Sequence, residues 1–541
     1  TFSSAQFGAG RISSTATVTG TTVTTAFVVN VVSDTAFDLS TFTFATWTAG
    51  TDTITVTGAG GAETLTGATA TASLDAGLGD DTLIVASSGQ VQVGDKYDGG
   101  GGTDTLQLGV AGTGTSIDLS TAANNGINGF LNIEAITFVN TSGTSTATFN
   151  AAQFGAGKIS TTVAVTGTAS TQAFALNLSA GGALDLSGWT FAGWTSGTDT
   201  ITITGSTGSE TLVGSSQNDV LVVSNTNQVS ATDRYDGGGG TDTLQIGVVG
   251  AGTSIDFSAG ATDGVDGFLS IEALTFTNTS GTSTATFSSA QFGAGGISST
   301  VSVTGTSSAT ALVLNLAAGG SLDLSVWTFA TWTSGTDTIT VTGSTGTESI
   351  VGTSFNETFV VSNTSQVAAG DKTDAGGGTD TLQIGAAGAG TSIDLRAGAT
   401  DGINGFLNFE AIAFTNTSGT STATFSSGQF GAGKISGSVT VTGTSSTTAL
   451  VINVGSGTAF DISTFTFATW TAGTDTITIT GAGGSETITG STATVAIDGG
   501  LGDDTLIVAS TAQVQPGDRY DGGGGTDTLQ IGLVAPAQAS T

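Results

Sequence analysis

Short stretches of the chain alternate apolar and polar residues at every second position. Residues 53–57 read Thr-Ile-Thr-Val-Thr, and residues 15–19 and 135–138 follow the same pattern. A period of two places the apolar side chains on one face of a strand, so these stretches predict half-buried β-strands. The chain has 86 glycines for tight turns and only 2 prolines to interrupt a ladder. Helix signals are nearly missing, and the pattern predicts an all-β protein.

The chain contains four long tandem repeats. The pair Thr1-Phe2 recurs as Thr148-Phe149, Thr286-Phe287 and Thr424-Phe425, which gives repeats of 147, 138 and 138 residues and a shorter last copy. The predicted domains are repeat unit 1 (1–147), repeat unit 2 (148–285), repeat unit 3 (286–423) and the truncated repeat unit 4 (424–541). Stacked coils explain this strict spacing better than separate sandwiches do. We therefore predict a right-handed parallel β-solenoid, a β-helix or β-roll, built from these four repeats.

The repeats differ in length by one nonapeptide. From the first acidic turn residue to the next is 18 residues in repeat units 1 and 4, as from Glu63 to Asp81, but only 9 in repeat units 2 and 3. In a two-sided roll with about 18 residues per coil, nine extra residues shift the next strand to the opposite sheet. We expect the added piece, about Ala68 to Ala76, to loop out in part or to widen one rung.

A glycine-rich motif returns in each repeat, and repeat unit 4 has a second full match to its nonapeptide pattern at residues 499–507. Residues 97–107 read Tyr-Asp-Gly-Gly-Gly-Gly-Thr-Asp-Thr-Leu-Gln, and nearly the same text returns at 235–245, 373–383 and 520–530. Glycines aim backbone carbonyls inward where a Cβ would block them, and the aspartate adds charge. A hard cation takes roughly six to eight such oxygen ligands. The pattern Gly-Gly-x-Gly-x-Asp-x-apolar-x is typical of a calcium-binding β-helix.

The composition agrees with a folded acidic protein. There are 42 acidic and 8 basic residues, a formal net charge of −34, yet only 9% of residues are charged and 37% are hydrophobic. Cations at acidic turns would relieve the self-repulsion, and nucleic acid is excluded as a partner. Cysteine, methionine and histidine are absent, which removes disulfides, imidazole bases and the usual zinc ligands. We find no signal segment and no apolar run long enough to insert in a membrane, and we expect the sequence to be an excerpt or a processed product.

The nonapeptides, together with stretches such as residues 205–219, resemble RTX proteins, the calcium-binding repeat proteins that Gram-negative bacteria export by type I secretion. The long β-rich stretches between nonapeptides are similar to bacterial surface-layer proteins and large repetitive adhesins. The resemblance implies secretion in an unfolded state, folding outside the cell with Ca²⁺ as cofactor, and an extracellular or bacterial cell-surface location. The chain departs from the family because few nonapeptides are adjacent. Several turns also end in glutamate, and we interpret these as vestigial half-sites that cap strands: Glu63, Glu210, Glu348, Glu357 and Glu486.

The candidate calcium ligands follow from the motif. The aspartate that closes each glycine turn comes first, the acid of the preceding turn is its partner, and the aspartate just before the glycines supplies a further carboxylate. Turn aspartates that only accept hydrogen bonds remain the alternative, and this is the reading we prefer for acids such as Asp38, Asp52 and Asp118. Lys96, Arg234, Lys372 and Arg519 are expected to form local ion pairs. The metal candidates are Asp81, Asp98, Gly99, Gly101, Asp104, Asp219, Asp236, Gly237, Gly239, Asp242, Asp374, Gly377, Asp380, Asp504, Asp521, Gly522, Gly524 and Asp527.

Each repeat also carries an aromatic cluster, which is Phe42, Phe44 and Trp47 in repeat unit 1. Such a cluster serves either as a sugar-stacking platform or as core packing, and we favour core packing because the residues recur at one register. Threonine-rich strands suggest an ice-binding face, but ordinary solvent-facing threonines account for them.

Two functional classes and one variant follow from this reading. In the first, the protein is an extracellular structural rod that self-assembles through calcium into a surface layer, sheath or matrix filament. The variant is the stalk or ligand-binding region of an adhesin, with cell-surface polysaccharide as a partner. In the second class it is a calcium-assisted polysaccharide-processing enzyme on a β-helix. We expect no enzyme and no catalytic residue, because bases are sparse, histidine is absent and every acid is repeated.

Overall fold

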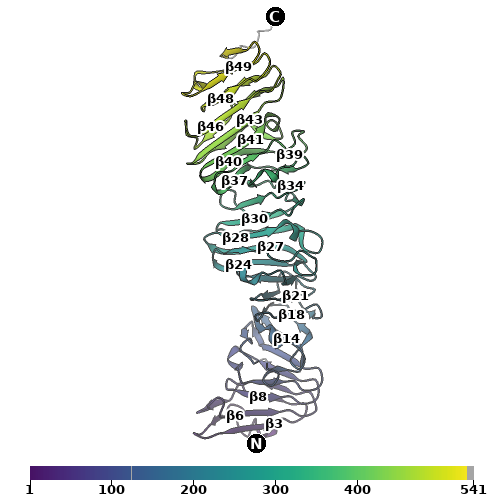
Figure 1. The fold of residues 1–541 in the computed structure, drawn as a ribbon. Coiled ribbons are helices and arrows are strands. Elements are labelled where there is room, and N and C mark those ends of the chain that lie inside the picture. The colour runs from purple at the N-terminus through teal and green to yellow at the C-terminus, as the bar shows by residue number, and fades with distance from the viewer. Residues whose placement is uncertain (124, 533–541) are drawn as a thin grey trace, which may run out of the picture. The chain divides into compact units, whose positions relative to one another are not determined.

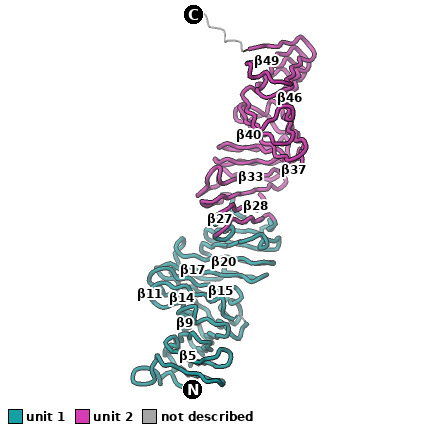
Figure 2. The backbone as a smooth tube through the Cα atoms, turned by 90° about the vertical axis from the view of Figure 1, so that its left-hand side faces the viewer, with its two compact units in different colours: residues 1–249, 259–277, 294–298 teal, residues 250–258, 278–293, 299–541 magenta. Residues whose placement is uncertain are grey.

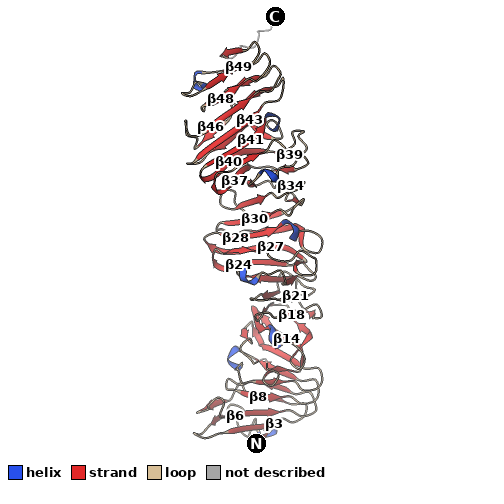
Figure 3. Cartoon of the chain, in the orientation of Figure 1, coloured by secondary structure: helices blue, strands red, loops and turns tan. Residues whose placement is uncertain are grey.

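Parallel β-strands make up almost all of the structure. The computed structural model describes residues 1–123 and 125–532, and Figure 3 shows strands throughout, with helix confined to single turns. Strands that follow one another along the stack pair in parallel, as β6 (Thr53–Thr57) does with β8 (Ala72–Asp75). The fold is a parallel β-solenoid, which confirms the predicted fold class. The 3₁₀ turns are η1 (Ser4–Gln6), η2 (Ser88–Gln90), η3 (Ala151–Gln153), η4 (Thr226–Gln228), η5 (Ser289–Gln291), η6 (Thr364–Gln366), η7 (Ser427–Gln429) and η8 (Thr511–Gln513).

The chain divides into two compact parts, coloured separately in Figure 2. The N-terminal part comprises residues 1–249, 259–277 and 294–298, and the C-terminal part comprises 250–258, 278–293 and 299–541. Of repeat unit 4, residues 533–541 lie outside the described residues. The division rests on spatial contacts and is separate from the four repeats of the sequence. Within the described residues, no helix is long and apolar enough to cross a membrane.

The N-terminal part contains four sheets and one strand pair (Figure 1). The first sheet consists of β1 (Phe2–Ser3), β3 (Ala26–Asn30), β6, β8, β10 (Lys96–Asp98) and β13 (Gly129–Leu131). The second consists of β4 (Ala36–Asp38), β7 (Thr64–Thr66), β9 (Thr82–Val85), β11 (Thr105–Thr113), β14 (Ile133–Ser142), β16 (Ile159–Thr166) and β19 (Thr190–Ala192). The third includes β12 (Ser116–Asp118), β15 (Thr144–Asn150), β17 (Thr171–Asn177), β20 (Thr200–Thr204), β22 (Asp219–Val223), β24 (Thr243–Ala251) and β27 (Ile271–Ser280). The fourth consists of β18 (Ala183–Asp185), β21 (Thr211–Val213), β23 (Arg234–Asp236) and β26 (Gly267–Leu269), and the strand pair is β2 (Thr17–Thr19) with β5 (Thr43–Ala45).

The C-terminal part repeats this construction. Its longest sheet consists of β25 (Ser254–Asp256), β28 (Ser283–Ser288), β30 (Thr310–Asn315), β33 (Thr338–Thr342), β35 (Glu357–Val361), β37 (Thr381–Ala389), β40 (Phe409–Ser418), β42 (Ile435–Thr442) and β45 (Thr466–Ala468). A second consists of β31 (Ser321–Asp323), β34 (Ser349–Val351), β36 (Lys372–Asp374) and β39 (Gly405–Leu407). A third consists of β38 (Ser392–Asp394), β41 (Thr420–Ser426), β43 (Thr447–Asn453), β46 (Thr476–Thr480), β48 (Val495–Asp498) and β50 (Arg519–Asp521). A fourth consists of β44 (Ala459–Asp461), β47 (Thr487–Thr489), β49 (Thr505–Val508) and β51 (Thr528–Ile531), and β29 (Ile297–Thr304) pairs with β32 (Thr328–Ala330).

Aliphatic ladders fill the interior of the coils. In the second sheet, Leu65 pairs with Leu83, Leu83 with Leu106, and Leu106 with Ile136, each one coil further along. All four side chains are fully buried. Because the pairing is in register, each apolar residue of a strand meets the apolar residue of the next coil, and one alternating strand pattern builds the whole core.

The extra nonapeptide of the long repeats forms half a coil. In repeat unit 1, β8 pairs in register with β6 before it and with β10 after it. The expectation that residues 68–76 loop out or widen a rung is therefore wrong. From β6 to β11 the chain crosses between the first two sheets five times, whereas from β20 to β24 in repeat unit 2 it crosses four times. The shift to the opposite sheet takes place in full, because a turn and a strand fit into nine residues.

Candidate metal centre

The glycine turns of consecutive coils stack directly on one another. In repeat unit 1 the turn at 76–81 joins β8 to β9, and the turn at 99–104 joins β10 to β11. Gly79 N donates to Gly101 O at 2.8 Å, and Gly101 N donates to Gly77 O at 2.9 Å. The turns of repeat unit 4 are held in the same way, through Gly502 and Gly524. The motif spacing thus brings two glycine turns and their two closing acids together.

The closing acids form a column along the stacked turns. In repeat unit 1 the amide N of Glu63 donates to Asp81 Oδ1 at 2.6 Å, and the amide N of Asp81 donates to Asp104 Oδ1 at 2.8 Å. The amide N of Asp104 in turn donates to Glu134 Oε2 at 2.9 Å. Both aspartates are at most 1% exposed. One oxygen of each carboxylate therefore holds the coils together.

The other oxygen of these carboxylates has no partner. Asp81 Oδ2 and Asp104 Oδ2 are buried without a hydrogen bond in the described part of the chain. An unpaired buried carboxylate oxygen is strongly unfavourable unless a cation compensates it. The same state recurs in the other repeats, at Asp219 Oδ1, Asp380 Oδ2 and Asp504 Oδ2.

Each repeat has an equivalent pair of acids. The amide N of the first acid donates to Oδ1 of the second in the pairs Asp219 with Asp242 at 2.8 Å, Glu357 with Asp380 at 2.7 Å, and Asp504 with Asp527 at 3.0 Å. The structure therefore brings Asp81, Asp219 and Asp504 together with the motif aspartates, as predicted. In repeat unit 3 the first acid of the pair is Glu357. This residue is not among the candidate metal ligands predicted from the sequence.

Burial raises the pKa of these acids. Desolvation, with the charge of the neighbouring acid as a smaller cause, raises the pKa of Asp104 to about 6 and that of Asp242 to about 8. Desolvation likewise raises the pKa of Asp219 to about 7 and that of Asp380 to about 7. Ionisation of both acids of a pair is therefore opposed by burial and by their mutual repulsion, and a divalent cation between the two carboxylates would offset both effects.

Two of the motif glycines are required by the stacking. Gly100 has φ +92°, and a Cβ there would lie 2.0 Å from Gly77 O; Gly102 has φ +146°, and its Cβ would lie 1.9 Å from Gly79 O. At the first glycine, Gly99, a Cβ would lie 2.3 Å from Asn132 O, but its φ is not positive and repeat unit 3 accommodates the buried Ala375 at that place. The close approach of backbone to backbone is the condition under which carbonyl oxygens of two turns reach one ion.

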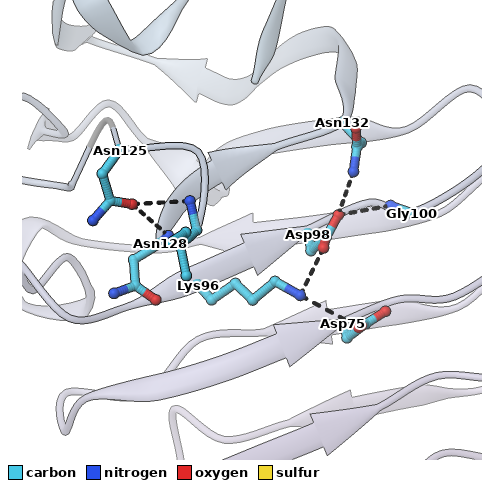
Figure 4. A network of polar contacts seen from close by, with 8 residues as sticks. Asp75, Lys96, Asp98, Gly100, Asn125, Asn128 and Asn132 are labelled. Atoms are coloured by element: carbon cyan, nitrogen blue, oxygen red, sulfur yellow. Dashed lines mark hydrogen bonds and ion pairs between the residues drawn. The ribbon is translucent and has the colours of Figure 1, made fainter. Parts of the chain in front are cut away.

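The aspartates just before the glycines have other partners. Asp98 Oδ1 accepts from Asn132 Nδ2 at 2.7 Å and from Gly100 N at 3.2 Å, while Oδ2 pairs with Lys96 Nζ at 2.7 Å, as Figure 4 shows. Lys96 Nζ also lies 3.4 Å from Asp75 Oδ2. The pairs Arg234 with Asp236, Lys372 with Asp374, and Arg519 with Asp521 repeat this contact. The local ion pairs expected from the sequence are thus confirmed, and they occupy the carboxylates of Asp98, Asp236, Asp374 and Asp521.

A second class of buried acids is fully satisfied without a metal. Asp95 Oδ1 accepts from Ala72 N at 2.8 Å and its Oδ2 from Gln92 N at 2.6 Å. Asp52 is held in the same way by the amides of Thr25 and Thr48, which confirms its role as a turn acid. The glutamate of the first turn also caps: Glu63 accepts from the amides of Asp34 and Ala59 at 2.8 and 2.9 Å. These acids connect coils through backbone hydrogen bonds alone.

Sequence reasoning missed the acids that close the columns. Glu134, Glu272 and Glu410 accept the amide of the motif aspartate at 2.9, 2.8 and 2.9 Å. Their signal is a fixed distance of 30 residues from Asp104, Asp242 and Asp380. They follow a tight corner with positive φ at Asn132, Ser270 and Asn408.

The site has few side-chain ligands of its own. Among residues 1–123 and 125–532, no group of three or more His, Cys, Asp or Glu side chains is placed to hold a metal ion. A cation between stacked turns would therefore depend on two carboxylates together with backbone carbonyls, as the glycine motif suggests. No protein-family model, no curated protein and no solved structure matches the chain.

Proposed function

We propose that the protein is an extracellular structural protein, a β-solenoid whose stacked glycine turns bind Ca²⁺ and which self-assembles into a surface layer, sheath or matrix filament. The observation that carries the proposal is that the acid pair of every repeat includes at least one buried carboxylate oxygen without a partner in the described part of the chain. The net charge of −34 supports it, because bound cations would reduce the repulsion that opposes folding. Since calcium is scarce inside cells, such a protein would fold after export.

The proposed ligands are the paired acids and the turn carbonyls. Each pair of acids would supply the carboxylate ligands on one side of an ion. The pairs are Asp81 with Asp104, Asp219 with Asp242, Glu357 with Asp380, and Asp504 with Asp527. Ca²⁺ suits these sites because it accepts oxygen ligands at variable number and geometry, whereas Mg²⁺ demands a stricter octahedron. Binding to the folded state alone would stabilise the solenoid by mass action.

Two matched sets of variants test the calcium proposal. The first replaces the motif acids by asparagine (Asp104→Asn, Asp242→Asn, Asp380→Asn and Asp527→Asn). The second replaces the capping acids at the matching place of the neighbouring turn (Asp95→Asn, Asp233→Asn, Asp371→Asn and Asp518→Asn). Thermal unfolding by circular dichroism, with calcium and with chelator, gives the calcium-induced rise in Tm. We expect the motif set to lose most of this rise, while the capping set lowers Tm equally under both conditions.

The wild-type protein supplies the first control. We expect its β spectrum to weaken and its Tm to fall in excess chelator. An unchanged spectrum and Tm in chelator, or equal loss of the calcium effect in both variant sets, would show that the unpaired oxygens bind no calcium.

Self-association is the second part of the proposal. Identical side chains return at fixed spacing along the repeats, so a weak contact between two copies would recur at each repeat and add up. Sedimentation and electron microscopy at high protein and calcium concentrations should give sheets or filaments. If only monomers form under the same conditions, the self-association proposal is contradicted, and a calcium-bound stalk replaces the assembly protein as the proposed function.

A further inference from the structure

A surface groove lies beside the aromatic corner of repeat unit 4. One hollow, of about 360 Å³, is lined by Phe467, Trp470, Thr492, Thr494 and Gln515 among others. A second hollow, of about 270 Å³, is lined by Thr476, Thr478 and again Thr494. The two hollows adjoin at Thr494 and together make up the groove: the first lies beside β45, and the second lies over β46 and β48.

The second of these hollows has a counterpart in repeat unit 1, which neither Phe44 nor Trp47 lines. A hollow of about 610 Å³ there is lined by Thr53, Thr55, Thr71, Ser73 and Gln92 among others. Equivalent residues of repeat units 1 and 4 lie 423 positions apart, so Thr53 corresponds to Thr476, Thr71 to Thr494, and Gln92 to Gln515. Two distant copies of the sequence therefore build one kind of hollow.

The extra nonapeptide supplies one wall of the groove. Thr71 to Ser73 in repeat unit 1, and Thr492 to Ala496 in repeat unit 4, belong to the nine residues that repeat units 2 and 3 lack. The aromatic corner itself occurs in all four repeats. The groove wall is thus a feature of the long repeats, whereas the corner is general.

The aromatic corner is rigid. Phe467 and Trp470 meet edge to face with their ring centroids 5.2 Å apart, and Phe44 and Trp47 repeat this geometry at 5.2 Å. Thr469, just before Trp470, has φ +51°, a conformation that β-branched residues rarely adopt. Local strain of this kind persists only where the surroundings fix the backbone, and it is common at binding sites.

Some polar atoms at the groove are left without partners. The indole Nε1 of Trp470 and the Thr494 Oγ1 are buried with no hydrogen bond in the described part of the chain, so a ligand in the groove would reach them only after a side-chain movement. Exposed hydroxyls of Thr476 and Thr492 stand beside them.

The groove contains no free charge. No lysine or arginine lines the hollows, and the one acid of repeat unit 4 that does, Asp475, accepts backbone hydrogen bonds from Thr448 and Thr471 with its two oxygens. The acidic chain as a whole repels anions. Hydroxyls, an amide and an aromatic wall match a neutral ligand with apolar C–H faces and many hydroxyl groups.

We propose that the groove of repeat unit 4 and the matching hollow of repeat unit 1 bind a neutral saccharide chain, with Trp470 contacting the C–H face of a sugar ring in repeat unit 4 and the threonine and glutamine side chains contacting its hydroxyls in both. The elongated form suits several linked sugar units. This binding is independent of calcium at the glycine turns, since no paired acid lines the groove.

The test uses the full chain in calcium and a panel of neutral hexasaccharides: cello-, xylo-, manno-, laminari- and chitohexaose. Tryptophan fluorescence and calorimetry measure binding. Trp470→Ala should weaken binding of the active member at repeat unit 4 roughly tenfold or more. The matched control is Trp194→Ala with Trp332→Ala, which removes the same corner residue from the short repeats and should leave binding unchanged.

A variant pair avoids the aromatic packing. Thr53→Arg with Thr476→Arg places a long side chain in each groove from an exposed strand position, and Thr200→Arg with Thr338→Arg is its control in the short repeats. We expect loss of binding only in the first pair. The proposal is overturned if no hexasaccharide binds at millimolar concentration, if the control pairs lose as much as the test variants, or if hexagalacturonate binds as tightly as the neutral oligomers.

Discussion

At the scale of the residue, the buried aspartates Asp95 and Asp104 differ in one hydrogen bond, the one to the second carboxylate oxygen. Asp95 and Asp104 lie in the same coil, are almost fully buried, and each accept the amide of the preceding coil at 2.8 Å. Gln92 N then satisfies the second oxygen of Asp95, whereas the second oxygen of Asp104 has no partner. One backbone amide thus separates a structural cap from a candidate calcium ligand.

The two glycines at the start of the motif should respond differently to alanine. Gly100→Ala places a Cβ 2.0 Å from Gly77 O at a positive φ, so we expect a loss of roughly 1–3 kcal/mol in the free energy of unfolding. Gly99→Ala also requires a shift, since its Cβ would lie 2.3 Å from Asn132 O, but it should cost less because its φ is not positive and Ala375 occupies the equivalent place in repeat unit 3. Chemical denaturation of both variants in calcium gives the comparison, and equal losses would contradict it.

Repeat unit 3 lacks a tyrosine that the other repeats contain. Tyr235 donates to Glu210 Oε2 at 2.9 Å and stacks on Phe268 at 5.4 Å, and Tyr97 and Tyr520 are its equivalents. Thr373 stands at this place in repeat unit 3. A threonine side chain is too short to fill the space of the ring or to reach the glutamate.

We therefore expect Thr373→Tyr to stabilise the protein. The new ring would pack on Phe406, and its hydroxyl would donate to Glu348, whose pKa is raised by burial. The reverse variant, Tyr235→Thr, should lower the free energy of unfolding by roughly 3–5 kcal/mol, as for other large-to-small changes in a core. Thermal unfolding of both variants provides the measurement. A lower Tm for Thr373→Tyr would mean that the coil has closed over the missing ring.

At the scale of the element, the unit of construction is half a coil, which consists of one turn and one strand. Repeat unit 1 uses five crossings between β6 and β11, and repeat unit 2 uses four between β20 and β24. In the long repeats Glu63 therefore lies in the same column as Asp81, as its amide shows. In repeat unit 2 the amide of Glu210 instead donates to Asp233, in the column of capping acids.

Deletion of residues 68–76 should give a folded protein. The deletion converts repeat unit 1 to the spacing of repeat units 2 and 3, and each remaining strand keeps an in-register neighbour. We expect an unchanged β spectrum and a Tm within a few degrees of the wild type. Deletion of only residues 70–74 is the control; it removes part of a half coil, exposes the apolar face of the strand and should unfold the repeat. Equal stability of the two deletions would contradict the half-coil rule.

Much of the fold and the site could be predicted from sequence, for physical reasons. Alternation in residues 53–57 fixes which face of the strand is buried, and the constant distance of 23 residues between Asp81 and Asp104 places them on stacked turns. Whether the second carboxylate oxygen has a hydrogen-bond partner depends on displacements of a few tenths of an ångström in the turn, which the sequence pattern does not specify. Sequence therefore did not separate Asp98, held by Lys96 and Asn132, from Asp104.

At the scale of the whole molecule, buried carboxyls control the response to pH. The chain has no histidine or cysteine, so between about pH 5.5 and 8.5 the side chains that titrate are the carboxyls with a raised pKa. Desolvation raises the pKa of Glu357 to about 7 from an ordinary 4.5, and that of Asp242 to about 8 from 3.8. A raised pKa means that the folded state binds the proton more tightly than the unfolded state does.

Without calcium, the protein should become less stable as the pH rises. The contribution of these groups is fully present below about pH 4 and is lost as the pH passes through about 6 to 8, the folded pKa values of Asp104 and Asp242. We expect Tm in chelator to fall from pH 5.5 to 8.5. With calcium the trend should flatten or reverse, since protons and cations compete for the carboxylates. A Tm in chelator that rises with pH would contradict the assignment.

The half coil that separates long from short repeats also bears on how such a chain diversifies. An insertion of nine residues adds half a coil. Every motif beyond the insertion then moves to the opposite face of the solenoid, although the sequence of the motif is unchanged. A gene that gains twenty-seven nucleotides by replication slippage could thus present an existing surface on the opposite face in a single step. An insertion that adds only part of a half coil within a strand would break the ladder.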